Sequence, residues 1–428
     1  MKNPHLLLIA GLMPALLAAC ASPSVAPGVP GGGGVLPYTV LTTLNNGTEV
    51  RNGGFGSAAT AHPSRANHFY ALTDRGPNAD FKGSAGNGKK FPVPDYTPRI
   101  GEFQLQTNGQ IALVRTILLK DPTGKPISGL PNPPGLGATG EVPYDNSGKV
   151  LNTDRHGLDS EGLAAMQDGS FWVSDEYGPH IAHFSPDGVE LERMSPLGIQ
   201  TSGRKLPAVL ARRWANRGME GLTVTPDGKT LVGVMQSTLY NPNKQKAANL
   251  TLTRILTFDL ASGATRQYLY RQDKPKNANS EIAALTATTF LMVERDGRYS
   301  GEEPAQKSLY KIDLAGATDV SGDTSAPDGL LINGKTLEES DWEALEKAGI
   351  QPVGKQRVAD VVAMLPNRYP HDKLEGLWVI DAHRVGVIND DDFAVVPDGD
   401  TVAQKKLPGA GFVDRGTLYI LTLDKPLF

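Results

Sequence analysis

The chain has 428 residues, with 46 acidic side chains, 42 lysine or arginine side chains and a formal charge of −4 at pH 7. It contains no basic stripe, which argues against nucleic acid as a partner. Glycine (48 residues) and proline (32) are frequent and only 7% of residues are aromatic, which fits many tight turns between short strands.

The first residues are typical of a bacterial lipoprotein leader. Lys2 precedes an apolar run at residues 6–17 that is short for a membrane span. The run ends in Leu-Ala-Ala-Cys, which resembles a lipobox, and Cys20 is the only cysteine of the chain. We therefore expect a signal peptide over residues 1–19 and a lipid on Cys20. The protein would be anchored to a bacterial membrane through this lipid alone, with its domain facing the periplasm or the cell exterior. The alternative is an ordinary secretory signal with an incidental cysteine.

The segment after the cysteine predicts a flexible tether. Residues 21–37 contain four prolines, five glycines and no charged side chain, a composition typical of linkers. We assign residues 20–37 to the lipidated cysteine and its tether, and residues 38–428 to the folded domain.

The folded part predicts a series of β-hairpins. The clearest spans residues 161–176 and turns at an Asp-Gly pair, a strong hairpin signal between β-prone runs. A second hairpin follows at 183–194, and two consecutive hairpins make a four-stranded blade. The same pattern recurs at 55–74 with 100–118, 218–236 with 252–270, 281–294 with 309–320, and 373–389 with 416–423.

This recurrence predicts an all-β fold, namely a β-propeller of about five to six four-stranded blades. Residues 38–50 are expected to pair with the last strand and close the ring. Two segments lie outside the pattern. One is a Pro/Gly-rich insertion at 121–158. The other, 321–370, contains helix-like pieces at 337–348 and 358–365 and is the candidate for a degenerate sixth blade.

A glutamate opens the first strand of four of these units. Glu161, Glu220, Glu281 and Glu375 follow one another at intervals of 59, 61 and 94 residues. Equivalent positions of successive blades meet around one axis, so we expect a ring of carboxylates at one mouth of a central channel. A β-sandwich, the main alternative fold, would not explain this acidic repeat.

Acidic residues that end the return strands should join the same ring, because a hairpin brings the chain back to the end it left. Such a cluster is costly to desolvate unless a cation occupies it. A ligand set of oxygens without cysteine favours calcium over magnesium or manganese and argues against zinc. No organic cofactor is expected. Solvated residues at strand edges are the alternative. The expected metal ligands are Glu161, Asp175, Glu176, Glu220, Glu281, Glu294, Glu375 and Asp390.

Basic residues are expected at the same mouth, where they would bind a small anionic substrate, specifically a phosphorylated one. Structural ion pairs are the alternative role for them. The chain has no Gly-x-Ser-x-Gly elbow, His-Glu-x-x-His motif or Walker loop, so metal-activated water is the expected nucleophile. The expected catalytic residues are Glu161, Glu220 and Arg75. The expected substrate-binding residues are Arg75, Arg155, His156, Arg217 and Lys373.

Several of these segments carry a family resemblance. Thr-Asp-Arg-Gly-Pro-Asn at 73–78, Asp-Ser-Glu-Gly at 159–162, Trp-Val-Ser-Asp-Glu-Tyr-Gly-Pro at 172–179, Asn-Arg-Gly-Met-Glu-Gly at 216–221 and Val-Glu-Arg at 293–295 resemble the phytase-like domain family, described as "esterase-like activity of phytase". That family is similar to the calcium-dependent β-propeller phytases, six-bladed enzymes whose channel-mouth acids hold calcium ions that bind phosphate and activate water.

The resemblance implies an extracytoplasmic, calcium-dependent hydrolase of phosphoric esters. Two alternatives remain open from the residues themselves. One is a metal-dependent carboxylesterase or lactonase that uses the same mouth, and the other is a non-catalytic, calcium-stabilised propeller that displays a binding surface.

Overall fold

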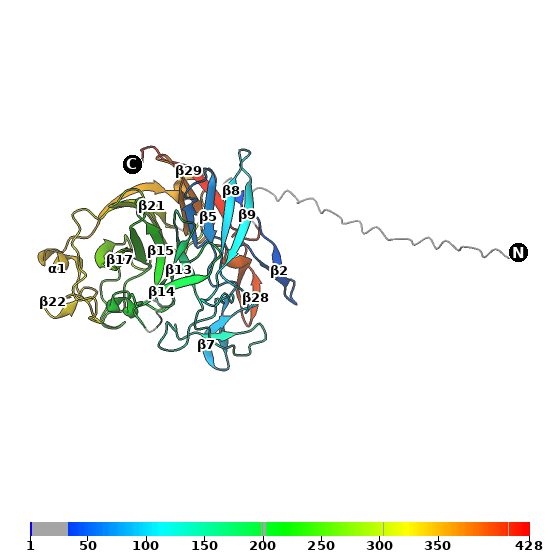
Figure 1. Cartoon of the computed structure of the whole chain (residues 1–428), viewed down its shortest axis with the longest axis horizontal. Helices are drawn as coiled ribbons and strands as arrows, with labels where there is room; N and C mark the ends of the chain where they lie inside the picture. Colours follow the sequence, from blue (N-terminus) through cyan, green and yellow to red (C-terminus); the bar gives the residue numbers. More distant parts are fainter. Residues whose placement is uncertain (2–32, 198, 200–202, 303, 410) are drawn as a thin grey trace.

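The computed structural model describes residues 1, 33–197, 199, 203–302, 304–409 and 411–428. Cys20 and the expected signal peptide therefore lie outside the described residues. Within the described part the regular secondary structure is mainly β-strand, with only short helices, which confirms the all-β prediction (Figure 1). No helix there is long and apolar enough to cross a membrane.

Five antiparallel four-stranded sheets dominate the described part of the chain. The first contains β4 (Ala58–Ala61), β5 (His68–Leu72), β8 (Arg99–Leu105) and β9 (Ile111–Leu118). The second contains β11 (Ser160–Ala165), β12 (Phe171–Asp175), β13 (His180–Phe184) and β14 (Glu190–Met194). The third contains β15 (Met219–Val224), β16 (Thr230–Met235), β17 (Leu252–Asp259) and β18 (Thr265–Arg271).

The fourth sheet contains β19 (Ala278–Ala284), β20 (Thr289–Arg295), β21 (Lys307–Asp313) and β24 (Gly354–Asp360). The fifth contains β25 (Gly376–Val379), β26 (Arg384–Ile388), β29 (Thr417–Thr422) and β1 (Gly34–Val35). The first strands of the five sheets contact one another in the order β4, β11, β15, β19 and β25, and β25 in turn contacts β4.

The turns follow from local chemistry. At the tip of β11–β12, Gly169 has a φ of 87°, a conformation that glycine adopts without strain. The preceding Asp168 accepts hydrogen bonds from the Ser170 backbone N–H (2.9 Å) and hydroxyl (2.7 Å). This Asx turn explains why Asp-Gly predicted the hairpin correctly.

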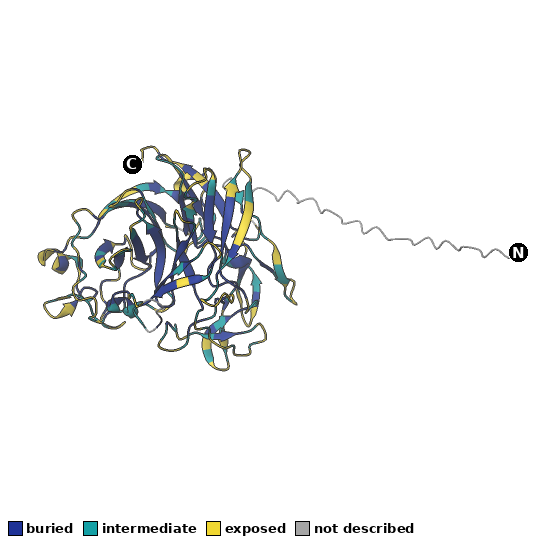
Figure 2. Ribbon diagram, in the orientation of Figure 1, coloured by how far each residue is buried: buried dark blue, intermediate teal, exposed yellow. Residues whose placement is uncertain are grey.

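Apolar layers fill the spaces between neighbouring sheets, and Figure 2 shows that most strand residues are buried. Successive residues of one strand enter different layers, because side chains alternate across a sheet. Phe171 and Val173 pack with the first sheet, whereas Trp172, between them, packs with the third. A comparable layer joins the third sheet to the fourth, the fourth to the fifth and the fifth to the first. Each sheet is therefore buried on both faces.

One expected pairing was wrong. Residues 38–50 do not pair with the last strand; β2 (Val40–Thr43) and β3 (Glu49–Arg51) form a hairpin of their own. The partner of β29 is β1, which lies within the segment assigned to the tether. Leu36, which follows β1, is only 1% exposed. The folded domain thus includes residues before Tyr38.

The segment 321–370 is not a degenerate blade. It contains β22 (Leu331–Ile332), β23 (Lys335–Thr336) and α1 (Trp342–Lys347) before β24 completes the fourth sheet. Of the helix expected at 358–365, residues 358–360 belong to β24 and only α2 (Val361–Met364) is helical. Residues 309–320 were expected to form a hairpin that supplies the third and fourth strands. Instead β21 is the third strand of this sheet and β24, which pairs with it, is the fourth.

A smaller sheet stands beside the five. It contains β6 (Ala79–Gly83), β7 (Gly86–Lys90) and β10 (Val142–Tyr144), the last from the Pro/Gly-rich insertion. The hairpin of β27 (Val395–Asp398) and β28 (Thr401–Gln404) contacts this sheet through β6.

Candidate functional site

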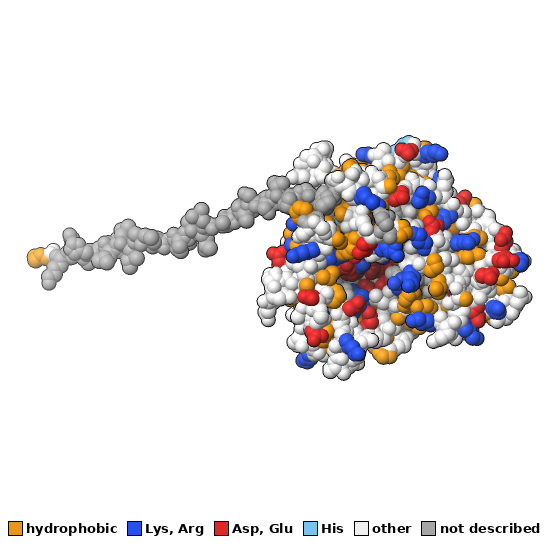
Figure 3. All heavy atoms as spheres, turned by 180° about the vertical axis from the view of Figure 1, so that it is seen from behind, with side chains coloured by type: hydrophobic (Ala, Val, Ile, Leu, Met, Phe, Trp, Pro, Cys, Tyr) orange, Lys and Arg blue, Asp and Glu red, His pale blue; other side chains and the backbone are white. Residues whose placement is uncertain are grey.

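A polar cavity of about 310 Å³ opens where the first strands begin. Figure 3 shows a hollow in one face with acidic side chains at its bottom and lysine and arginine side chains beside it. The acidic residues that line the cavity are Asp74, Asp159, Glu161, Glu176, Glu220, Glu375 and Asp392, and the basic ones are Arg75, Lys89, Arg217, Lys276, Arg295 and Lys373. Opposite charges thus alternate around one small space.

Bulges in the first strands aim the repeated glutamates. In β11 the pairing shifts between Ser160 and Gly162, so Glu161 is the extra residue, and in β15 a similar shift spans Glu220. A bulge turns a side chain out of the regular ladder and is common next to functional sites. Glu161 and Glu220 therefore point into the cavity.

The glycines after these glutamates allow neighbouring first strands to approach closely. A Cβ on Gly162 would collide with Ser174 Oγ and with the backbone of Glu220 and Leu222 in β15. A Cβ on Gly221 would likewise collide with backbone atoms of Glu281 and Ile282 in β19. The Glu-Gly pairs thus combine an acidic side chain with a close strand contact.

Three buried carboxylates form the tightest acidic group among the described residues. Asp74, two residues beyond β5, meets Asp159 and Glu161, and one oxygen of each lies within 4.8 Å of the others. Calcium binds oxygens at 2.3–2.6 Å, so oxygens on opposite sides of one ion are about 5 Å apart. This spacing fits a single calcium ion. Burial, and secondarily the neighbouring acids, raise the pKa of both Asp74 and Glu161 well above the usual range.

A second acidic pair lies beside this triad. Gln236, just after β16, donates hydrogen bonds from its Nε2 to Glu176 Oε1 (2.6 Å) and to Glu220 Oε1. The other oxygen of Glu220 is buried and has no hydrogen-bond partner in the described part of the chain. Burial, followed by the charge of Glu220, raises the pKa of Glu176 well above its usual value. An orphaned carboxylate oxygen of this kind suits a cation or a proton.

Arg75 and Arg217 both line the cavity but differ in their partners. Arg75 Nη1 donates to Asn216 Oδ1 (2.9 Å) and lies 3.3 Å from both Glu141 and Asp159. Arg217 stacks over the Trp214 ring at 4.3 Å and forms no ion pair with any described residue. Burial lowers the pKa of Arg217 from its ordinary value, although an arginine remains charged at neutral pH. Its guanidinium is therefore available to an anionic ligand.

Unlike Arg217, Lys373 is held by two ion pairs. Its Nζ contacts Asp390 Oδ2 and Asp392 Oδ1, each at 2.6 Å. Burial alone would raise the pKa of Asp392, but Lys373 and Lys405 outweigh it and keep it low. Asp392, Phe393 and Ala394 all have a positive φ, an unusual run for residues other than glycine. This turn places both aspartates against the one lysine.

The structure brings seven of the expected site residues together in the cavity. They are Glu161, Glu176, Glu220, Glu375, Arg75, Arg217 and Lys373. Glu375 pairs with Arg295 of β20, so it contributes to the charge balance there. The metal-binding, catalytic and substrate-binding roles of these residues remain predictions.

Two expected ligands, Glu281 and Glu294, point elsewhere because of local register. In β19 the shift falls at Ser280, one residue earlier than in β11, so Glu281 stays in the ladder and accepts the N–H groups of Ile282 and Leu222. Glu294 contacts the Tyr270 hydroxyl and Lys355, while its neighbour Arg295 enters the cavity, because adjacent strand residues face opposite sides.

Asp175 also lies outside the cavity. Its two oxygens accept the backbone N–H groups of Asp159 (2.8 Å) and Gly178 (2.9 Å), so it shapes the chain around the triad. Asp390 supports Lys373 rather than lining the cavity. Arg155 is exposed, and His156 lies 3.7 Å from Glu190, so neither expected substrate ligand reaches the site.

Several residues that line the cavity were not among the expected site residues. Asp74 and Asp159 stand within the family-like segments and flank residues that were chosen, so the Asp-Arg and Asp-Ser-Glu patterns carried a usable signal. Lys89 and Lys276 come from loops and a side sheet whose position the hairpin pattern could not give.

Similar proteins fall into two groups. Among solved structures, a GH43 endo-arabinanase from Bacillus licheniformis is 11% identical over 87% of this chain and 94% of its own, with a TM-score of 0.35. A virginiamycin B lyase from Staphylococcus aureus is 11% identical over 84% of this chain and 92% of its own, with a TM-score of 0.29. Among curated proteins, an "Uncharacterized secreted protein" of Arthroderma benhamiae is 30% identical over 291 residues.

That match covers 57% of this chain, which spans about half (55%) of the length of the fungal relative. A family model gives wider coverage. The model described as "esterase-like activity of phytase" matches residues 50–393, which include all five first strands and every acidic residue of the cavity. The chain belongs to this phytase-like family, as the motifs of its sequence indicated.

Proposed function

We propose that the protein is a calcium-dependent phosphoester hydrolase built as a five-bladed β-propeller. The cyclic contacts of β4, β11, β15, β19 and β25, and the apolar layer between each neighbouring pair of sheets, support the propeller. Family membership supports chemistry on an ester bond.

One observation carries the proposed activity: the carboxylate triad of Asp74, Asp159 and Glu161 shares its cavity with Arg75, Arg217 and Lys373. Oxygen ligands for a hard cation and guanidinium groups for a phosphate thus converge on one space. The triad oxygens and the orphaned Glu220 oxygen fit a calcium ion, which when bound would offset phosphate charge and make water more acidic.

The side chains of the chain itself would do the remaining work. Arg217 and Arg75 would orient the phosphate oxygens. Glu176, whose pKa is raised by burial and then by the charge of Glu220, would hold a proton more readily than an ordinary glutamate and would deliver it to the departing alcohol oxygen. The cavity lining is almost wholly charged or amide-bearing, with Ala278 and Gly297 as exceptions, which disfavours an esterase or lactonase with an apolar pocket.

A substrate panel tests this function. The purified domain, assayed with calcium and with EDTA, should release phosphate from phosphomonoesters only with calcium. Arg217→Ala should lower kcat/KM by about tenfold or more, because it removes a charge-assisted contact to phosphate. Arg212→Ala, a half-buried arginine paired with Asp328 outside the cavity, is the matched control and should leave turnover unchanged. Turnover of carboxyl esters alone, or no turnover by a folded and calcium-loaded protein, would overturn the proposal.

We also propose an extracytoplasmic location with a lipid on Cys20. The leader sequence and the secreted fungal relative support it. Cys20→Ser should leave an unprocessed or unanchored protein, measured by membrane fractionation and apparent mass. A variant that stays in the membrane fraction at the wild-type mass would contradict the anchor.

A further inference from the structure

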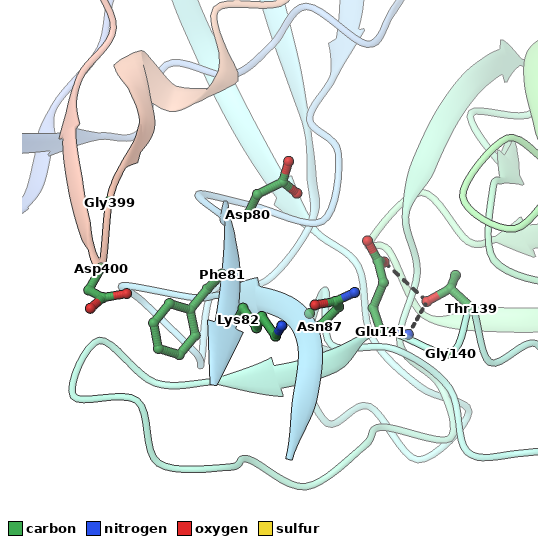
Figure 4. Close-up of a pocket in the computed structure, with 10 residues that line it drawn as sticks. Asp80, Phe81, Lys82, Asn87, Thr139, Gly140, Glu141, Gly399 and Asp400 are labelled. Carbon is green, nitrogen blue, oxygen red and sulfur yellow. Dashed lines mark hydrogen bonds between the residues drawn. The ribbon is translucent and has the colours of Figure 1, made fainter. Parts of the chain in front are cut away.

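A larger hollow of about 670 Å³ adjoins the polar cavity. It lies between the β6–β7 hairpin, the loop before β10 and the tip of the β27–β28 hairpin. In Figure 4, Asp400 and Phe81 lie at one end, Thr139 and Glu141 at the other, and Lys82 and Asn87 between them. Three segments distant in sequence therefore form it.

The hollow and the cavity share a wall. Arg75, which lines the cavity, lies 3.3 Å from Glu141, which lines the hollow. Lys89 of the cavity contacts Asp80 of the hollow at 2.5 Å. Glu141 is fixed in this wall, since Thr139 Oγ1 donates to it at 3.1 Å. A ligand held by Arg75 is thus separated from the hollow by a single ion pair.

The two spaces differ in charge. Six basic side chains line the cavity, but Lys82 is the one lysine or arginine among the residues lining the hollow. The hollow carries the carboxylates of Asp80, Glu141 and Asp400, with the Asn87 amide and the Phe81 ring. Lys90 lies behind this lining, where it donates to the Asp400 backbone oxygen and covers the Phe81 ring at 4.3 Å. The hollow therefore offers hydrogen-bond acceptors and an amide rather than an anion site.

We propose that this hollow receives the alcohol part of the phosphoester, and that this alcohol is an uncharged, hydroxylated group rather than a polyphosphate. The inference rests on the function proposed above. Hydroxyl groups donate well to carboxylates. A second phosphate would instead meet the carboxylate of Asp400 and those of Asp80 and Glu141, whose partners Lys89 and Arg75 are already engaged, so it would find little compensating charge. In the reaction, water adds its oxygen to phosphorus, the bond from phosphorus to the alcohol oxygen breaks, and the alcohol leaves with a proton. Neutral alcohol and hydrogen phosphate balance the atoms and the charge.

The test compares four substrates. Glycerol 1-phosphate and glucose 1-phosphate carry neutral hydroxylated alcohols, phytate carries further phosphates, and methyl phosphate has too small an alcohol to fill the hollow. The wild type should prefer the two neutral-alcohol esters to phytate by about tenfold or more in kcat/KM. Asp400→Lys should lower the kcat/KM ratio of neutral-alcohol esters to phytate and should change kcat/KM for methyl phosphate little. Asp398→Lys, an equally exposed aspartate of the same hairpin outside the hollow, is the matched control.

The outcomes separate the two proposals. The inference is overturned if phytate is hydrolysed as fast as the neutral-alcohol esters or faster. It is also overturned if the kcat/KM ratio of neutral-alcohol esters to phytate is the same in Asp400→Lys and Asp398→Lys. In both cases hydrolysis of methyl phosphate would still support the proposed phosphoester hydrolase. If a folded, calcium-loaded protein hydrolyses none of the four substrates, methyl phosphate included, both the proposed phosphoester hydrolase and this inference are overturned.

Discussion

The carboxyl of Glu161 illustrates the chemistry of the site at the scale of one residue. It is buried beside Glu220, Asp159 and Glu176 and pairs with no lysine or arginine in the described ranges. Two unit charges 4 Å apart repel by about 4 kcal/mol at an effective dielectric constant of about 20. The group must therefore bind protons or a cation, and these two states compete for the same oxygens.

Asp159 allows a direct test of the cation. Asp159→Asn should weaken calcium binding by at least about tenfold, because it removes one charge from a triad whose oxygens lie within 4.8 Å. Isothermal titration calorimetry measures the affinity. Asp187→Asn, at the exposed tip of β13–β14, is a control that should bind calcium like the wild type. Equal calcium affinity in Asp159→Asn and the wild type would remove the triad as the site.

At the scale of the element, the first strand of each sheet combines a bulge with a tight neighbour contact. Gly162→Ala should destabilise the fold by about 1–3 kcal/mol, because the added Cβ meets backbone that cannot move independently. Urea unfolding measures the loss as a lower midpoint. Gly354→Ala in β24 is the control, since its nearest neighbour would be 3.7 Å away. Equal midpoints for the two variants would contradict this account of the Glu-Gly pairs.

The elements also show how far the sequence could go. Asp-Gly turns located the hairpins because their chemistry is local, as the Asp168–Ser170 contacts show. The fate of Glu281 was not predictable, because Asn-Ser-Glu and Asp-Ser-Glu look alike while their bulges differ by one residue. Glu294 was expected at the cavity, yet its neighbour Arg295 lines it, because which of two adjacent side chains faces inward depends on register. Lys276 and Lys89 reach the cavity through tertiary placement alone.

At the scale of the whole molecule, both ends of the described domain meet in one sheet. β1 pairs with β29, so the fifth sheet is complete only when the first and last strands come together. The β27–β28 hairpin and the side sheet then stand beside the cavity and form the hollow. The site therefore depends on segments from the full length of the domain, and its acidic residues come close only after folding.

That dependence predicts how stability responds to pH without metal. Burial and neighbouring carboxylates raise the pKa of Glu161 and Glu176 well above the ordinary glutamate value of about 4.3 that the unfolded chain retains. Above the unfolded value the native state binds more protons than the unfolded state, so the free energy of unfolding falls as the pH rises from about 4.3 toward the raised native values. Melting temperatures in EDTA across this range measure the slope.

Calcium should reverse this loss, because it binds the deprotonated carboxylates of the folded state and displaces their protons. The gain in melting temperature on adding calcium should therefore grow as the pH rises. Glu161→Gln should reduce both the pH dependence of the melting temperature in EDTA and the rise in melting temperature on adding calcium. Glu343→Gln, on the exposed face of α1, should alter neither quantity. A metal-free protein whose stability stays constant or increases over this pH range would show that the buried acids are already neutralised by the arginines and lysines around them, and that the cavity does not need a cation.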